Sequence, residues 1–277
     1  MITQLEREIL VENKKLSVFV IIIKDKKEKE ILGFALSDWV ADAVGDFSSI
    51  VIEREKEDVL NLAKKYLTNS SYTLVLSGNL PLITKNAIRN LVDYATFKSV
   101  NACKFMGGGI YNTEYLKQTK SIFYDSVYTQ NDDLFYIVEN AKQLAYATEV
   151  LRSRIIDFHI ANGVCFKSIK NTVIEKNVVI KSGVVINGGN TIKGDTVINE
   201  GCIIKENNII EDSVLGKNTC VANSTILKTK IGNDTIIMPY SNINECDIGN
   251  NVIVFGNISL LKKKIKDNRK IKNKEVN

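Results

Sequence analysis

The sequence predicts a protein of two domains, a layered α/β domain followed by a parallel β-helix of hexapeptide repeats. In the first 137 residues, short apolar runs alternate with segments of helical periodicity, which is typical of Rossmann-like βα layers. From Ile174 onward an aliphatic residue recurs about every six positions, a period that neither an α-helix nor an ordinary strand produces. We expect an α/β domain over 1–137, a linking helix within 138–164, a β-helix over 165–261 and a basic tail over 262–277.

Three apolar runs predict the parallel strands of the first domain. They are short and rich in β-branched residues, and they cover residues 18–23, 50–52 and 73–76. Helical spacing follows each of them, over residues 36–44, 58–67 and 84–94, and Thr84 is placed to cap the last helix. We also expect a helix over residues 2–13 and a long helix over roughly 134–160, which leads into the repeats.

The repeat region predicts a three-sided solenoid, in which each six-residue unit is one short strand plus a turn. The aliphatic side chains point inward and stack from coil to coil, and three units close one coil, giving about five coils. Glycine and asparagine occupy turn positions, where they accept a positive φ at low cost. The stacked positions are Ile174, Ile180, Ile186, Ile192, Ile198, Ile204, Ile210, Leu215, Val221, Ile226, Ile231, Ile237, Ile243, Ile248, Val254 and Leu260.

The net charge of +5 comes from the C-terminal end of the chain. Residues 262–277 hold eight basic residues against Asp267 and Glu275, which leaves the rest of the chain almost neutral. This distribution favours a solvated tail over a nucleic-acid site. Because Ile258, Leu261 and Ile265 have i, i+3, i+7 spacing, we expect a short amphipathic helix that caps the β-helix.

Targeting and cysteine patterns exclude several classes of protein. The longest apolar run, residues 18–23, is too short to span a bilayer, and the N-terminus lacks a signal-peptide pattern. We therefore expect a cytoplasmic protein without a membrane partner. The five cysteines contain no C-x-x-C pair, so they predict neither a disulfide framework nor a zinc site.

Five stretches carry a resemblance to a known family. Residues 73–84 (TLVLSGNLPLIT) resemble its V-L-V-L-x-G-D-x-P-L-[IL]-T loop, and residues 109–111 (GIY) resemble its N-[TS]-G-I-Y. Residues 143–164 resemble its Q-L-A-x-A hinge, while residues 210–216 and 238–241 resemble its I-x-D-S-x-I-G and P-Y-S coil motifs. Over nearly its whole length, the chain thus resembles the bifunctional N-acetylglucosamine-1-phosphate uridyltransferase / glucosamine-1-phosphate acetyltransferase (GlmU) family.

The resemblance implies a nucleotidyltransferase-like first domain and a left-handed β-helix. It also implies a connection to UDP-N-acetylglucosamine and cell-wall precursors, with a nucleotide or sugar phosphate as ligand. On its motifs, Gly78, Gly109 and Tyr111 are the candidate substrate-binding residues. Family members associate as trimers through the β-helix. We expect a homotrimer here, with outward apolar residues at Val173, Val179, Val185, Val197, Ile203 and Ile209.

The family's triphosphate loop is absent from this chain. The family has L-A-A-G-x-G-T-R-M, whose glycines let backbone N–H groups approach the phosphates. Here residues 21–23 (III) run directly into residues 24–30 (KDKKEKE). Lysines 24, 26, 27 and 29 could meet a phosphate, but the alternation of charges favours a surface turn.

The family's metal pair is altered as well. Its aspartate and asparagine hold Mg²⁺, and the matching positions here are Asn79 and Glu139, as if the two residue types had changed places. Asn79 and Glu139 are therefore the candidate Mg²⁺ ligands. The alternative is a relaxed loop and an exposed helix residue without a metal. The family's sugar-contacting asparagine is replaced by Gly107.

The acetyltransferase half lacks its general base. His159 is the one histidine of the chain, and it matches the family's hinge histidine, for which we expect a structural hydrogen-bonding role. The family's acetyl-coenzyme A coils are expected to be truncated away, because residues 254–261 run into the lysine-rich segment.

These departures give two competing functions. The first is a homologue that has lost efficient catalysis and acts as a binding, regulatory or scaffolding subunit, and for it we assign no catalytic residue. The second is an active sugar-nucleotide transferase with a rebuilt metal and phosphate site. Acetyl transfer is disfavoured by the position of His159.

Overall fold

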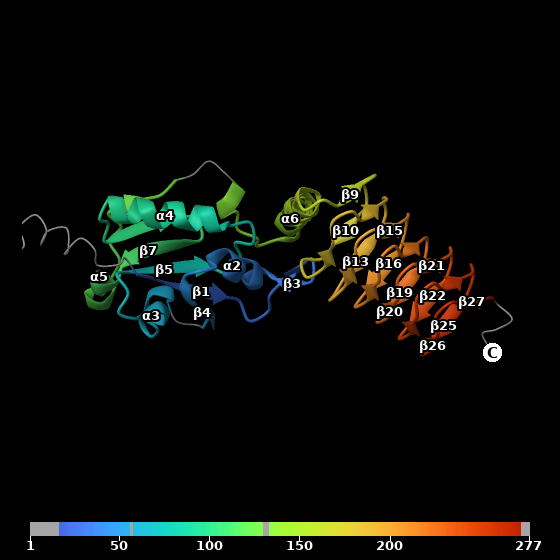
Figure 1. The fold of residues 1–277 in the computed structure, drawn as a ribbon. Coiled ribbons are helices and arrows are strands. Elements are labelled where there is room, and N and C mark those ends of the chain that lie inside the picture. The colour runs from blue at the N-terminus through green and yellow to red at the C-terminus, as the bar shows by residue number, and fades with distance from the viewer. Residues whose placement is uncertain (1–16, 56–57, 130–132, 273–277) are drawn as a thin grey trace, which may run out of the picture. The chain divides into compact units, whose positions relative to one another are not determined.

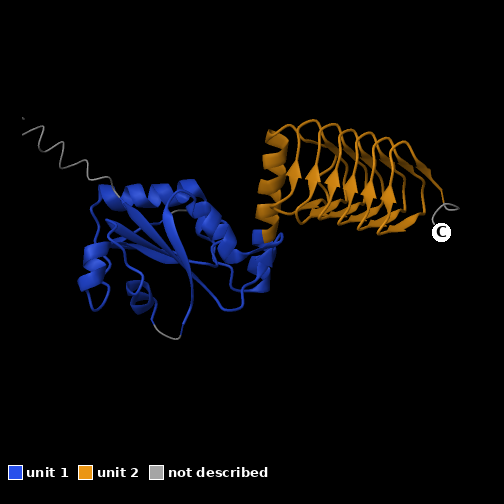
Figure 2. Cartoon of the chain, turned by 60° about the horizontal axis from the view of Figure 1, so that its bottom comes forward, with its two compact units in different colours: residues 1–147 blue, residues 148–277 orange. Residues whose placement is uncertain are grey.

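The computed structural model describes residues 17–55, 58–129 and 133–272 (Figure 1). The chain divides into two compact units, residues 1–147 and 148–277 (Figure 2). The helix predicted over residues 2–13 lies outside the described residues. In the described part of the chain, no helix is long and apolar enough to cross a membrane.

The first unit is built on a six-stranded sheet of order β4-β1-β5-β7-β6-β8. β1 is the parallel neighbour of both β4 and β5, and β7 runs antiparallel between β5 and β6. The three predicted strands are confirmed as β1, β4 and β5. The strands are β1 (Val18–Lys24), β4 (Ser48–Glu53), β5 (Tyr72–Ser77), β6 (Ala102–Phe105), β7 (Gly108–Asn112) and β8 (Ser126–Val127), and β2 (Glu30–Ile31) and β3 (Phe34–Ala35) form a separate hairpin.

Helices cover both faces of this sheet. Alternate residues of β1 enter different cores: Val20 and Ile22 pack with α2 and α4, whereas Ile21 and Ile23 pack with α3 and α5. The helices of the first unit are α2 (Leu36–Val44), α3 (Val59–Lys64), α4 (Lys85–Phe97), α5 (Thr113–Gln118) and the 3₁₀ helix η1 (Asp133–Phe135), and α6 (Ala141–Ala161) includes the residues where the first unit ends and the second begins. Thr84 caps α4 as predicted, because its Oγ1 accepts a hydrogen bond from the Ala87 N–H at 3.2 Å.

The second unit is a parallel β-helix with three flat sheets (Figure 2). The first sheet holds β10 (Val173–Ile174), β13 (Thr191–Lys193), β16 (Ile209–Glu211), β19 (Thr225–Leu227), β22 (Asn242–Asn244) and β25 (Ser259–Leu261). The second holds β11 (Val179–Ile180), β14 (Val197–Ile198), β17 (Val214–Leu215), β20 (Lys230–Ile231), β23 (Asp247–Ile248) and β26 (Lys264–Ile265). The third holds β9 (Cys165–Phe166), β12 (Val185–Ile186), β15 (Ile203–Ile204), β18 (Cys220–Val221), β21 (Ile236–Ile237), β24 (Ile253–Val254) and β27 (Lys270–Ile271).

The predicted aliphatic stack forms the core of this unit. The inward residues pair in register between coils, for example Ile192 with Ile210 and Ile226, and all three are fully buried. Asparagines at the corners, such as Asn207 and Asn218, have φ near +56° and +57°, as expected for the turns of a left-handed hexapeptide β-helix.

The β-helix continues beyond the predicted boundary. Up to residue 272, the last one described, it forms six coils rather than five, and residues 262–272 belong to the sixth coil instead of a tail. The amphipathic helix predicted over Ile258–Ile265 is wrong, because β25 and β26 occupy these residues. The same apolar spacing satisfies the six-residue period, and Ile265 and Ile271 stack on Ile248 and Val254. The linking helix also begins later than predicted, at Ala141, after the 3₁₀ turn η1.

The outward apolar residues are spread over all three sheets, two of the six predicted positions on each. Only the third sheet keeps an apolar outward row through most coils. On the first sheet, the outward positions of the later coils are polar, at Thr225, Asn242 and Ser259. The outward row of the third sheet, called the apolar row below, consists of Val185, Ile203, Cys220, Ile236 and Ile253.

His159 lies near the end of α6 and is only 3% exposed. Its Nδ1 atom has no hydrogen-bond partner among the described residues, so the expected hydrogen-bonding role of its ring is not seen at this atom. Burial lowers the pKa of His159 below its usual value of 6.5. The folded protein therefore holds this imidazole in its neutral form.

We predict that His159 makes the protein less stable in mild acid. Below pH 6.5 the unfolded chain binds a proton at this residue that the folded chain does not, so the free energy of unfolding falls as the pH drops. The loss should develop between pH 7.5 and about pH 5.5, and one proton limits its slope to about 1.4 kcal/mol per pH unit. Urea denaturation of the protein and of H159Q at both pH values checks this. An equal acid response in the two proteins would contradict it.

Candidate functional site

The carboxyl ends of β1, β4 and β5 meet at one edge of the first-unit sheet, where ligands bind in open parallel sheets. Polar residues follow each strand at this edge. An open pocket of about 700 Å³ lies between the ends of β1 and β4. It is lined by Asp25, Lys26, Glu53, Arg54 and Glu55.

Gly78 lets the loop after β5 lie directly against the end of β1. Its N–H donates a hydrogen bond to the Ile23 carbonyl at 2.7 Å. A Cβ atom added here would lie only 3.1 Å from the Cα of Lys24. The close packing of these two segments therefore explains why a glycine occupies position 78, independently of any substrate.

Asn79 lies between two other segments of the edge. Its Nδ2 donates to the Asp25 carboxylate at 3.0 Å, and its carbonyl accepts a hydrogen bond from the Val138 N–H at 2.9 Å. The second bond brings the loop after β5 beside the segment that contains Glu139. Asp25 was missed in the sequence analysis, because only the fold places the residue after β1 opposite the residue after β5.

Glu139 is exposed and takes part in the start of α6. Its N–H donates to Gln143 Oε1 at 2.9 Å, and its carbonyl accepts a hydrogen bond from Lys29 Nζ at 2.6 Å. Within residues 17–55, 58–129 and 133–272, no group of three or more His, Cys, Asp or Glu side chains could hold a metal ion. The oxygen ligands that Mg²⁺ prefers are present here as the carboxylates of Asp25 and Glu139 and the amide of Asn79.

The segment that replaces the triphosphate loop is closed by its own side chains. Glu28 pairs with Lys24 Nζ at 3.3 Å and accepts two hydrogen bonds from Ser37, from its N–H at 3.1 Å and from its hydroxyl at 2.9 Å. The Glu28 side chain is only 9% exposed as a result. Lys24 and Lys29 thus have internal partners, whereas Lys26 and Lys27 are exposed, so the segment is the mixed-charge turn that the sequence favours.

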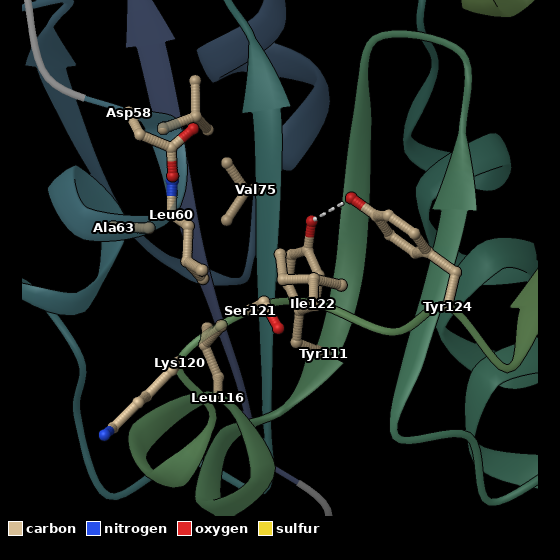
Figure 3. A pocket seen from close by; sticks show the side chains of 11 residues that line it. Asp58, Leu60, Ala63, Val75, Tyr111, Leu116, Lys120, Ser121, Ile122 and Tyr124 are labelled. Carbon is tan, nitrogen blue, oxygen red and sulfur yellow. Dashed lines mark hydrogen bonds between the residues drawn. The ribbon is translucent and has the colours of Figure 1, made fainter.

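Tyr111 lines a second pocket, of about 340 Å³, on the sheet face that carries α3 and α5 (Figure 3). Tyr111 is buried, and its hydroxyl lies 3.2 Å from that of Tyr124. Burial raises the pKa of Tyr111, so the phenol stays protonated. A Cβ atom on Gly109 would lie 2.3 Å from the Tyr111 hydroxyl, so Gly109 makes room for the ring.

The rest of this Tyr111 pocket combines an apolar floor with a polar rim. Val75, Leu116 and Ile122 are apolar, and Lys120 and Ser121 come from the loop after α5 (Figure 3). Asp58 lies at the opposite side and caps α3 by accepting a hydrogen bond from the Leu60 N–H at 3.1 Å. Tyr124 was missed because nothing in its local sequence distinguishes it from other exposed aromatic residues.

Comparison with known proteins identifies relatives of the chain, although no family model matches it. The bifunctional protein GlmU of Clostridium acetobutylicum is 38% identical over 135 residues, which cover 48% of this chain and 30% of that protein. The bifunctional protein GlmU of Clostridium kluyveri is 36% identical over 135 residues, and that of Clostridioides difficile is 34% identical over 116 residues. The chain is a relative of the GlmU proteins.

The matched segment spans 25% to 30% of the length of these GlmU proteins. The α/β sheet followed by a parallel β-helix agrees with the expected GlmU-like fold.

We predict that Glu28 stabilises the closed turn. Replacing it in E28A leaves the Ser37 N–H and hydroxyl without an acceptor and should cost about 1–3 kcal/mol of unfolding free energy. The exposed Glu30, which lies nearby in β2, provides the control variant E30A with the same change of charge. Urea denaturation measures both, and an E28A loss no larger than that of E30A would contradict the role of Glu28.

Proposed function

We propose that this GlmU relative has lost efficient nucleotidyl transfer and acts as a binding, regulatory or scaffolding subunit. The observation that carries the proposal is the Glu28 network, which fills the position of the triphosphate loop with a buried carboxylate. Transfer of a nucleotidyl group needs N–H donors and cations directed at the phosphates. Here three carboxylates, of Asp25, Glu53 and Glu55, outnumber the two cations that line the neighbouring pocket, so it lacks the net positive charge that attracts a triphosphate.

The binding role is supported by the Tyr111 pocket. Its volume of about 340 Å³ suits a small molecule. Its mixture of apolar floor, tyrosine hydroxyls and Lys120 suits a ligand with an anionic group. A sugar phosphate or nucleotide is therefore the ligand class that we propose for this subunit.

We predict that the purified protein does not form UDP-N-acetylglucosamine from UTP and N-acetylglucosamine-1-phosphate in the presence of Mg²⁺. Without oriented donors for the triphosphate, the rate should fall several orders of magnitude below the enzyme-like value of about 1 s⁻¹. Chromatographic detection of the nucleotide sugar tests this, with the Clostridium acetobutylicum GlmU protein assayed in parallel. Turnover near 1 s⁻¹ by this chain would refute the loss of catalysis.

The second candidate function is an active sugar-nucleotide transferase with a rebuilt metal site. The Val138–Asn79 hydrogen bond favours it, because it brings the segments of Asn79 and Glu139 together beside Asp25. If turnover is found, N79A and E139A should abolish it, while the exposed control E30A should not. Acetyl transfer is disfavoured, since the single histidine of the chain is buried in α6.

We further propose that the β-helix assembles as a homotrimer through the apolar row. Ile203 and Ile236 in this row are 43% and 39% exposed, although both side chains are large and apolar. The first sheet offers no equivalent surface, because Asn242 and Ser259 are polar at the corresponding outward positions.

We predict a particle of about three times the chain mass of 31.0 kDa in light scattering at micromolar concentration. The variant I203E/I236E should dissociate it, since charges in an apolar contact are desolvated without a partner. The variant N242E/S259E places the same charges on the first sheet and should keep the assembly. A monomer of 31.0 kDa, or a trimer that survives I203E/I236E, would refute this interface.

A further inference from the structure

The last described coil of the β-helix has a different charge from the coils before it. Residues 262–272, called the basic coil below, contain seven basic residues and one acid, Asp267. The equivalent positions one coil earlier carry no basic residue. In the places of Lys264, Lys266, Arg269 and Lys270, that coil has Asp247, Gly249, Val252 and Ile253. Earlier coils carry scattered lysines balanced by acids, whereas residues 262–272 hold a large net positive charge directly after a stretch, residues 245–261, without a basic residue.

The backbone of the basic coil is held in place by the coil before it. Gly249 and Ile253 donate N–H hydrogen bonds to the carbonyls of Ile265 and Arg269, each at 2.9 Å. Ile265 and Ile271 point inward, so the lysines project outward from an ordered frame. A preorganised arrangement of charges binds a partner with less entropy loss than a flexible tail would.

Internal ion pairs leave much of this charge uncompensated. Lys262 pairs with Glu245 at 3.6 Å, and Lys264 pairs with Asp247 at 3.5 Å. For Lys266, Arg269 and Lys270, no ion pair within 4.0 Å is formed with any carboxylate in the described ranges. All three side chains are exposed. Lys266 and Arg269 lie in the corner between β26 and β27, and Lys270 is the first residue of β27.

Asp267, the acid at this corner, faces the preceding coil. Its carboxylate accepts hydrogen bonds from the Asn250 N–H at 2.8 Å and from Asn250 Nδ2 at 3.2 Å. These bonds lower the pKa of Asp267, which keeps it charged but holds it in the turn. The corner thus offers cations outward and keeps its carboxylate in a structural contact.

We propose that the basic coil is a docking site for an acidic segment of a partner protein. Electrostatic attraction between the exposed cations of the basic coil and the carboxylates of an acidic segment would drive their association. The coil contains no aromatic residue on which a nucleic-acid base could stack, and the nearby Phe255 ring is covered by Lys272 Nζ at 5.4 Å. Its two isoleucines face the core, and the exposed Leu261 directly before it is a single side chain rather than the apolar face of a membrane-binding surface.

Residue type supports a carboxylate ligand as well. Six of the seven basic residues are lysines, which act as single point charges, whereas phosphate recognition favours the bidentate geometry of arginine. The proposal does not depend on whether the first unit retains catalysis, because the basic coil belongs to the second unit.

Fluorescence anisotropy with a labelled polyglutamate peptide tests the proposal on the full chain. Binding should occur at about 50 mM salt and weaken strongly at about 300 mM, because exposed charges are screened. The variant K266Q/R269Q/K270Q should weaken binding about tenfold or more. The matched control K167Q/K170Q/K181Q removes the same charge from exposed residues of the earlier coils and should change binding by less than about twofold.

Several outcomes would overturn the proposal. Equal losses in the two triple variants would show that only net charge matters. Absence of peptide binding at low salt would exclude the docking site. Stronger competition by a single-stranded oligonucleotide or by anionic vesicles than by unlabelled polyglutamate would assign the surface to a different partner. Thermal melting of both variants establishes that they remain folded, and K266Q/K270Q provides a milder variant if the triple change lowers the melting temperature.

Discussion

The stacking of one aliphatic side chain on another in every coil is the constraint on which the second unit depends. An inward residue such as Ile226 is fully buried between its equivalents one coil away. Because the side chains of a strand alternate, this requirement also determines which residues point outward. The apolar row and the basic coil are therefore consequences of the same register, and neither can move without disrupting the core.

In the first unit, burial of β1 on both faces has the equivalent role. Its residues enter two different cores, so a shift by one residue would exchange the side chains of the two cores and draw Ser17 or Lys24 into the buried part of the strand. The polar residues of the first candidate site, Asp25 among them, lie where this strand ends. In this chain the end of β1 leads to a turn closed by Glu28 and Ser37, in which the Glu28 carboxylate is held by internal partners.

The two candidate sites differ in how far they could be predicted. Gly78, Asn79, Gly109 and Tyr111 were found from the resemblance to the GlmU family, and the structure places them at two separate locations. Asn79 belongs to the strand-end cluster with Asp25, whereas Tyr111 forms a pocket with Tyr124 on one face of the sheet. Asp25 lies 54 residues from Asn79 and Tyr124 lies 13 residues from Tyr111, both beyond the span of one helix turn or strand pair, so no local pattern could have linked them.

The sequence by itself determined the periodic features of this protein: the alternating βα order and the six-residue stack. These features follow from local spacing and residue type. The tertiary structure alone decided that residues 262–272 form a sixth coil. Six lysines in so short a segment are typical of a solvated tail, and only the stacking of Ile265 and Ile271 on Ile248 and Val254 shows that the segment continues the β-helix. It also decided the partners of Glu28 and Asn79, since such contacts depend on how the ends of separate strands meet in space.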